Sequence, residues 1–230
     1  MHIMEGGLSW QWCLVWWLIA LPSPIFGVYH LKKILAADRK VLPLLGVNSG
    51  FIFILSSLKL PSITGSCSHP TGTGLSKISF GPWITTVVCT IVLLFQSLFL
   101  AHGGLSVLGA NIVSMGVVGP LAGYVLYRLF RDTTFSVYPT VFLVTALADM
   151  FTYVITSFQM ALAYPAETGG MLSLVIMFFG VFAVTQVPLA IIEGITLTLV
   201  FKYIVALKPD ILIRLKIFSE EKRERARGEI

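Results

Sequence analysis

The sequence predicts an all-α integral membrane protein with about seven transmembrane helices. Of its 230 residues, 56% are hydrophobic and only 12% are charged, whereas a soluble domain carries roughly twice that charged fraction. The mean hydropathy is +0.88. Apolar stretches recur as far as residue 207, so a single removable signal peptide does not explain them. Composition and pattern together exclude an ordinary soluble domain.

Six apolar stretches are long enough to cross a bilayer, which takes about 20 helical residues. They are 10–30, 41–58, 80–101, 104–130, 138–163 and 172–207. The last stretch is too long for one span, and it contains Pro188, which cannot donate a backbone hydrogen bond and tends to kink a helix. We therefore predict two spans that meet near residues 186–188.

The basic residues predict the orientation of the chain. They gather in loop 31–40 and in the tail from Lys202, and the positive-inside rule places both regions in the cytoplasm. The N-terminus is then outside the cell membrane, and a cytoplasmic C-terminus requires an odd number of spans, which we take as seven. Arg128 and Arg131 fall on the outer side in this arrangement.

Two regions are predicted along the chain. We expect residues 1–207 to form a transmembrane domain, which contains the candidate metal ligands described next, and residues 208–230 to form a charged cytoplasmic tail. The end of the tail, 219–230, mixes charges of both signs, so we expect a solvated helix or a disordered segment there and assign it no function.

The first two residues predict a metal site. Met1 and His2 place three nitrogen donors on one short stretch of backbone: the α-amine, the His2 amide nitrogen and the His2 Nδ1. One ion bound by all three closes two chelate rings, which force the donors toward one plane. Planar nitrogen ligation suits Ni(II) and Cu(II), and low-spin Co(II) can adopt it. Histidine is too large a second residue for the usual bacterial removal of the initiator methionine, so we expect Met1 to keep a free amine.

Segment 61–79 contains a candidate fourth ligand, His69. The segment is rich in glycine, proline and hydroxyl side chains, and the topology puts it on the same side as Met1. Cys67 is a rival ligand whose thiolate would favour Zn(II) or Cu(I); alternatively it is a small packing residue.

Other polar residues are assigned lesser roles. His30 borders the basic loop, and His102 ends a span on the predicted inner face, too far from Met1 to be a ligand. Asp149 and Glu193 lie within spans, where ionisable groups suggest a site or an ion path. The alternative is that they are neutral and hydrogen-bond between helices.

The sequence lacks the common catalytic motifs. It contains no G-x-x-x-x-G-K-[ST] phosphate loop and no H-E-x-x-H zinc-protease motif. We therefore predict a chain that is not an enzyme, with no catalytic residue and no cofactor.

The Met1-His2 start, combined with segment Thr64–Gly74 (T-G-S-C-S-H-P-T-G-T-G), resembles one known family. It is similar to the substrate-capture (S) component of cobalt and nickel transporters of the energy-coupling factor type. Further matching runs are Leu100–Leu105, Gly109–Asn111, Val118–Pro120 and Phe182–Leu189, and the resemblance covers about residues 1–205.

The resemblance implies a six-helix core plus one extra N-terminal helix, with Met1 and His2 folded back to meet His69. It also implies partners: a transmembrane coupling (T) protein, cytoplasmic ABC ATPases that hydrolyse ATP, and a small accessory membrane subunit. The surroundings are the lipid bilayer, and no nucleic acid is involved.

The resemblance also implies that the transported ion is Co2+ or Ni2+. The first six residues look more like family members linked to cobalamin biosynthesis, which favours cobalt, whereas planar nitrogen ligation favours nickel. Two other classes stay open. A stand-alone secondary metal carrier would use Asp149 and Glu193 as its relay, and an intramembrane enzyme would use His69 or His102.

Overall fold

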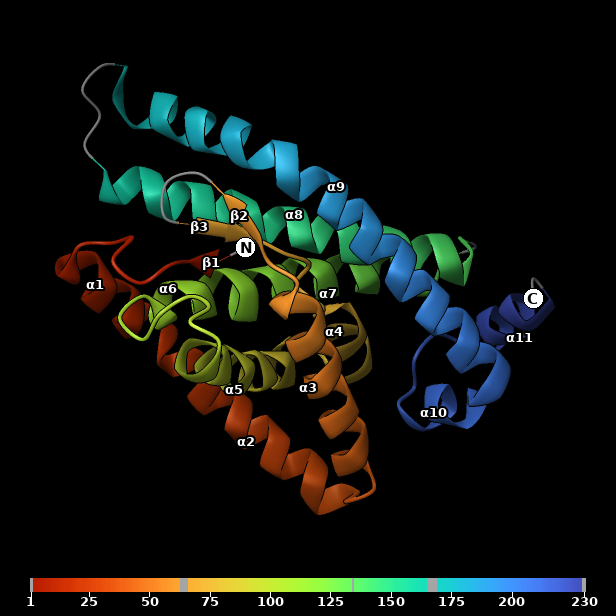
Figure 1. The fold of residues 1–230 in the computed structure, drawn as a ribbon. Helices are drawn as coiled ribbons and strands as arrows, with labels where there is room; N and C mark the ends of the chain where they lie inside the picture. Colours follow the sequence, from red (N-terminus) through yellow and green to blue (C-terminus); the bar gives the residue numbers. More distant parts are fainter. Residues whose placement is uncertain (1, 63–65, 134, 165–168, 229–230) are drawn as a thin grey trace.

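The computed structural model describes residues 2–62, 66–133, 135–164 and 169–228 (Figure 1). Helices surround a small antiparallel sheet. The helices are α1 (Trp10–Ala20), α2 (Pro22–Ala37), α3 (Val41–Ser57), α4 (Gly74–Phe80), α5 (Pro82–Phe99), α6 (Leu108–Asn111), α7 (Gly119–Phe130), α8 (Val137–Ala163), α9 (Gly170–Leu207), α10 (Pro209–Arg214) and α11 (Glu220–Gly228). The strands are β1 (His2–Ile3), β2 (Leu60–Ser62) and β3 (Ser66–Ser68), in the order β1-β3-β2. A π-helical segment, Ile112–Val118, joins α6 to α7.

The described helices confirm an all-α membrane protein. Five helical stretches are long and apolar enough to cross a bilayer, and α3 is a shorter apolar helix. The first stretch, Trp10–Ala37, combines α1 and α2. They meet at Pro22, in the first turn of α2, where the missing N–H costs no helical hydrogen bond.

The bundle has two ends. We name the end where Gly7 and Tyr164 lie the site end, and the end where Phe130 and Lys222 lie the tail end. At the site end, the Tyr164 hydroxyl after α8 donates to the carbonyl of Gly7 at 3.0 Å. At the tail end, the Lys222 ammonium of α11 donates to the carbonyl of Phe130, the last residue of α7, at 2.7 Å. Helices α7 and α9 therefore finish at the tail end, and α8 finishes at the site end.

The predicted break near Pro188 is wrong, because α9 is one helix of 38 residues with Pro188 inside it. Helix α8 packs along α9 on both sides of the proline. The Tyr153 hydroxyl donates to the carbonyl of Phe179 before it, and Gly194 lies against the Phe142 ring after it. Proline is tolerated in membrane helices where such neighbours hold the surrounding backbone.

An extra pass through the bundle lies instead at residues 66–80. Strand β3 begins at the site end, and the following loop and α4 carry the chain toward the tail end before α5 returns. Gly72 sits against the backbone of Ile52, and Gly74 against Leu197 and Thr145, so helices enclose this pass. Irregular backbone at membrane depth is allowed where protein surrounds it, and its polar composition hid it from a search for apolar stretches.

Because of this extra pass, the stretches that follow run in the opposite direction to the one predicted from the sequence. Stretch 80–101 runs toward the site end, and stretch 104–130 runs toward the tail end. The prediction that Arg128 and Arg131 lie on the side opposite the tail is therefore wrong. The Lys222 contact with Phe130 places the end of α7 directly against the tail.

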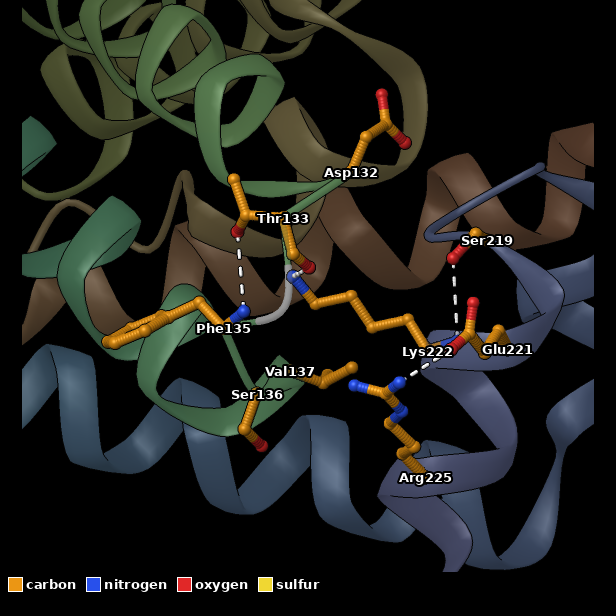
Figure 2. A pocket seen from close by; sticks show the side chains of 9 residues that line it. All are labelled: Asp132, Thr133, Phe135, Ser136, Val137, Ser219, Glu221, Lys222 and Arg225. Atoms are coloured by element: carbon orange, nitrogen blue, oxygen red, sulfur yellow. Dashed lines mark hydrogen bonds and ion pairs between the residues drawn. The ribbon is translucent and has the colours of Figure 1, made fainter.

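The tail is folded onto the bundle rather than fully solvated. Arg214 pairs with Asp38 at 2.8 Å, and Phe218 is buried. In Figure 2 the Lys222 side chain reaches across to the loop after α7 and lines a cleft with Asp132 and other residues. The other charged side chains of α11 are largely exposed. The helix is therefore amphipathic: one face packs on the bundle through Lys222, and the opposite face carries the mixed charges into solvent. The division of the chain at residue 207 stays a prediction.

Candidate metal centre

The N-terminal segment is threaded into the bundle. Strand β1 pairs with β3, in the register His2 with Cys67 and Ile3 with Ser66. Asn111 accepts from the Ile3 backbone N–H at 2.9 Å and donates its amide to the Ile3 carbonyl at 3.0 Å. Ile3 is fully buried. Both polar groups of its peptide backbone are thus satisfied, and the backbone that carries His2 is held in one position.

A second set of contacts holds the residues that follow. The Glu5 N–H donates to the Gly103 carbonyl at 3.0 Å, and the Ser106 N–H donates to the Glu5 carboxylate at 3.2 Å. Gly104 lies so close to Glu5 that a Cβ at this position would overlap it. The loop after α5 and the N-terminal segment therefore fit together without space for a side chain.

The His2 ring is oriented by Met115. His2 Nε2 lies 3.2 Å from the Met115 Sδ, and a thioether can only accept a hydrogen bond. The proton is therefore on Nε2, and Nδ1 carries the lone pair. This is the tautomer that a chelate through the His2 amide and Nδ1 requires.

The His69 ring is oriented in a similar way. His69 Nδ1 donates to the Pro70 carbonyl at 2.8 Å, so Nε2 carries the lone pair. His69 Nε2 is buried and makes no hydrogen bond to any described residue. The His2 and His69 ring centroids are 4.2 Å apart. A fixed tautomer and a buried lone pair without a donor are properties of a metal-binding histidine.

Helix α9 fixes the loop that carries His69. Glu193 accepts three hydrogen bonds from this loop, from the Thr71 N–H, the Thr71 hydroxyl at 2.8 Å and the Gly72 N–H at 2.9 Å. About two turns earlier in α9, the Gln186 amide donates to the His69 carbonyl at 3.3 Å and to the Asp149 carboxylate at 2.6 Å. Both acidic residues singled out from the sequence therefore support the His69 loop.

Two further side chains complete a buried cluster with His2 and His69. One donor atom from each of His2, Cys67, His69 and His102 lies within 4.8 Å of the others, and all four residues are buried. His102 Nε2 is 3.1 Å from His2 Nδ1. The prediction that His102 lies too far away on the other side is wrong, because the extra pass at 66–80 returns α5 to the site end.

Only two of the three residues predicted as ligands can be placed. The structure brings His2 and His69 together, and Met1 lies outside the described residues. His30 is elsewhere, and its Nδ1 is 3.1 Å from the Phe26 carbonyl. The sequence signal that could have located His102 is its Ala-His-Gly-Gly setting, in which Gly103 adopts a positive φ of 77° and turns the chain sharply after α5.

The buried histidines outside the helices are held in their neutral form. Burial lowers the pKa of His2 well below its usual value, and the neighbouring His69 and His102 rings lower it further. Burial also lowers the pKa of His102 to about 4. At pH 7 protons therefore do not compete for these ring lone pairs, and the cluster suits a borderline transition metal.

Replacement of Asn111 by leucine is expected to weaken Co2+ binding while the helices remain folded. The variant leaves the buried N–H and C=O of Ile3 without partners, at a cost of about 1–3 kcal/mol each, so the His2 backbone is no longer held. We expect a loss of affinity of about 10-fold to 1000-fold in a calorimetric titration.

The matched control is Asn48→Leu, because the Asn48 amide bonds within its own helix, to Leu44, at 2.8 Å. Equal affinities of the Asn111 and Asn48 variants would show that the clamp on Ile3 does not position the site.

These features define the class of protein: a multi-pass helical membrane protein that gathers nitrogen and sulfur donors at one buried centre, as proteins that handle transition metals do. The chain belongs to the CbiM family, described as "Cobalt uptake substrate-specific transmembrane region", which matches residues 2–211.

Individual relatives agree with the family. The chain is 61% identical over 227 residues to the "Putative cobalt transport protein CbiM 2" of Methanosphaerula palustris, covering 99% of this chain and 97% of that protein. It is 48% identical to the "Putative fused cobalt transport protein CbiMQ" of Methanocorpusculum labreanum, covering 96% of this chain and 38% of that protein. A crystal structure of a truncated transition metal transporter superposes with a TM-score of 0.78 and 25% identity, covering 90% of this chain and 99% of the other. The chain is thus a membrane component of cobalt uptake.

Proposed function

We propose that this chain captures Co2+ for an ATP-driven uptake transporter of the energy-coupling factor type, with Met1, His2 and His69 as ligands. The observation that carries the proposal is that His2 and His69 lie in one buried cluster of donor atoms, with the lone pairs on His2 Nδ1 and His69 Nε2. The other nitrogen of each ring is fixed by Met115 or Pro70. The Met1 amine and the His2 amide nitrogen would supply the remaining two donors.

Cobalt is the favoured cargo and nickel the alternative. Membership in a cobalt uptake family supports cobalt. Four nitrogen donors in a plane would also suit Ni(II). Mg2+ and Ca2+ prefer oxygen ligands, so we expect the site to reject both.

The distribution of charge supports capture from outside the cell membrane. Basic residues at Lys32, Arg39, Arg131 and along the tail all belong to the tail end, together with the Arg214–Asp38 pair. The positive-inside rule then favours a cytoplasmic tail end and an outward-facing site end.

The proposed partners are a transmembrane coupling protein, cytoplasmic ABC ATPases and a small accessory membrane subunit. One relative, described as a fused cobalt transport protein, matches 96% of this chain with 38% of its own length, which supports a close association with a further transport component. This chain has no phosphate-loop motif of its own, so ATP hydrolysis is assigned to partners.

The test is a calorimetric titration of the full chain with Co2+, Ni2+ and Mg2+. We expect tight 1:1 binding of Co2+ and Ni2+ and no binding of Mg2+. His69→Ala should weaken Co2+ binding by at least about 100-fold, which even a residue behind a ligand can cost. His30→Ala is the matched control and should bind normally. A normal affinity of His69→Ala for Co2+ would contradict the proposal.

The alternative function is a stand-alone secondary carrier. Its candidate relay groups, Asp149 and Glu193, are both hydrogen-bonded to the structure behind His69 rather than aligned along a path. Cobalt uptake that persists without any partner ATPase would favour the carrier, and uptake that stops would favour the capture subunit.

A further inference from the structure

Cys67 and His102 belong to the buried cluster but are not used by the planar set of Met1, His2 and His69. Cys67 Sγ lies 3.0 Å from His102 Nε2, and the same nitrogen lies 3.1 Å from His2 Nδ1. Both side chains are buried, at 3% and 1% exposure. His102 Nδ1 is buried without a hydrogen-bond partner among the described residues. A thiol and an imidazole thus belong to the buried cluster, and the planar set uses neither of them as a ligand.

The spacing of these atoms suits a tetrahedral ion. Zn–N distances of about 2.0–2.1 Å and a Zn–S distance of about 2.3 Å place the ligand atoms of a tetrahedron roughly 3.3–3.8 Å apart. In the structure one donor from each of the four side chains lies within 4.8 Å of the others, and two of the separations are 3.0 and 3.1 Å. Shifts of about 1 Å at side-chain ends would close the set.

We propose that His2, Cys67, His69 and His102 form a tetrahedral Zn2+ site, a second binding mode of the pocket that uses no backbone or terminal amine donor. The proposal shares His2 and His69 with the proposed function and rests on it to that extent. Zn2+ binds imidazole nitrogen and thiolate sulfur in tetrahedral geometry, whereas planar nitrogen ligation suits Ni2+.

Protons balance in this mode. Cys67 loses its thiol proton to solvent as sulfur binds, so one proton is released for each ion. His102 changes to the neutral tautomer with its proton on Nδ1, which frees Nε2. His2 and His69 already present Nδ1 and Nε2. All four positions of the ion are then filled by protein, as in a structural zinc site that lacks an open position.

The consequence is that Zn2+ occupies the pocket in competition with the transported ion. A planar ion leaves Cys67 and His102 unbound, and a tetrahedral ion leaves the terminal amine unbound. The two modes share His2 and His69, so they exclude each other. Zn2+ is therefore expected to inhibit the capture of Co2+.

The test uses the full chain with two glycines added before Met1, which removes the amine-based mode. Zn2+ and Co2+ are the probes, and Co2+ reports its geometry in the visible and near-ultraviolet spectrum. We expect 1:1 binding, strong visible bands typical of tetrahedral cobalt, and a sulfur-to-cobalt charge-transfer band that Zn2+ abolishes by displacement. Cys67→Ser should remove the charge-transfer band, and Cys67→Ser and His102→Ala should each weaken Zn2+ binding by more than about 100-fold.

Cys89→Ala is the matched control, because Cys89 is buried in α5 outside the cluster. It should retain the band, which also shows that a cysteine replacement is tolerated by the fold. The proposal is overturned if the extended chain binds neither ion, if bound Co2+ shows no sulfur band, or if Cys67→Ser keeps full Zn2+ affinity. If the unextended chain does not bind Ni2+, the planar mode alone is contradicted. A failure of the tetrahedral mode can therefore be distinguished from a failure of the planar mode.

Discussion

A chain extended by two glycines before Met1 is expected to lose tight Ni2+ binding. The extension converts the Met1 amine into a peptide nitrogen and moves the new terminal amine away from His2, so the two chelate rings cannot form. Strand β1 and the Asn111 clamp leave little freedom for the segment to reposition. We expect the affinity for Ni2+ to fall by about 1000-fold or more, about 4 kcal/mol.

Two residues are added rather than one for a chemical reason. One added residue would make His2 the third residue, and an amine, two amide nitrogens and an imidazole could then rebuild a planar site from the terminus alone. Calorimetry gives the affinity, and circular dichroism shows whether the helices persist. A chain with two glycines added after Ile230 is the control. If the N-terminally extended chain still binds Ni2+ as tightly as this control, the amine is not a ligand.

Glu193→Ala is expected to have the second large effect, on both stability and Co2+ binding. The carboxylate accepts from the Thr71 N–H, the Thr71 hydroxyl and the Gly72 N–H, and all of these groups are buried. Each of the three donors left without a partner costs about 1–3 kcal/mol, so the free energy of unfolding falls by roughly 3–9 kcal/mol. The loop is then free to move, and His69 no longer faces His2.

A second variant, Glu193→Gln, is expected to have an intermediate effect. Its amide oxygen can still accept from the Thr71 hydroxyl and the Gly72 N–H, but its NH2 group then faces the Thr71 N–H. We therefore expect the order of thermal stability and of Co2+ affinity to be wild type, then glutamine, then alanine. Glu221→Ala is the control, since Glu221 is 76% exposed and pairs with Arg225 in its own helix. A Glu193→Ala chain that unfolds and binds like the Glu221→Ala chain would show that this carboxylate does not hold the loop.

The sequence alone determined the class of fold and part of the site. Long apolar stretches can be recognised locally, because a helix in lipid must satisfy its own backbone and therefore needs about 20 apolar residues in a row. The pairing of His2 with His69 was also predictable, from the chelating terminus and a polar loop on the same side. The described structure brings these two rings together, while their role as ligands stays a proposal.

The tertiary structure alone decided the direction of the chain after residue 66 and the position of His102 beside His2. The pass at 66–80 is polar and partly extended, so it carries no local signal of a span, and protein rather than lipid surrounds it. The unbroken α9 likewise depends on α8, which packs on both sides of Pro188. Glu193, Asn111 and His102 contact partners between 35 and 122 residues away in sequence. Such contacts depend on how the helices pack, and neither composition nor spacing along the chain contains that information.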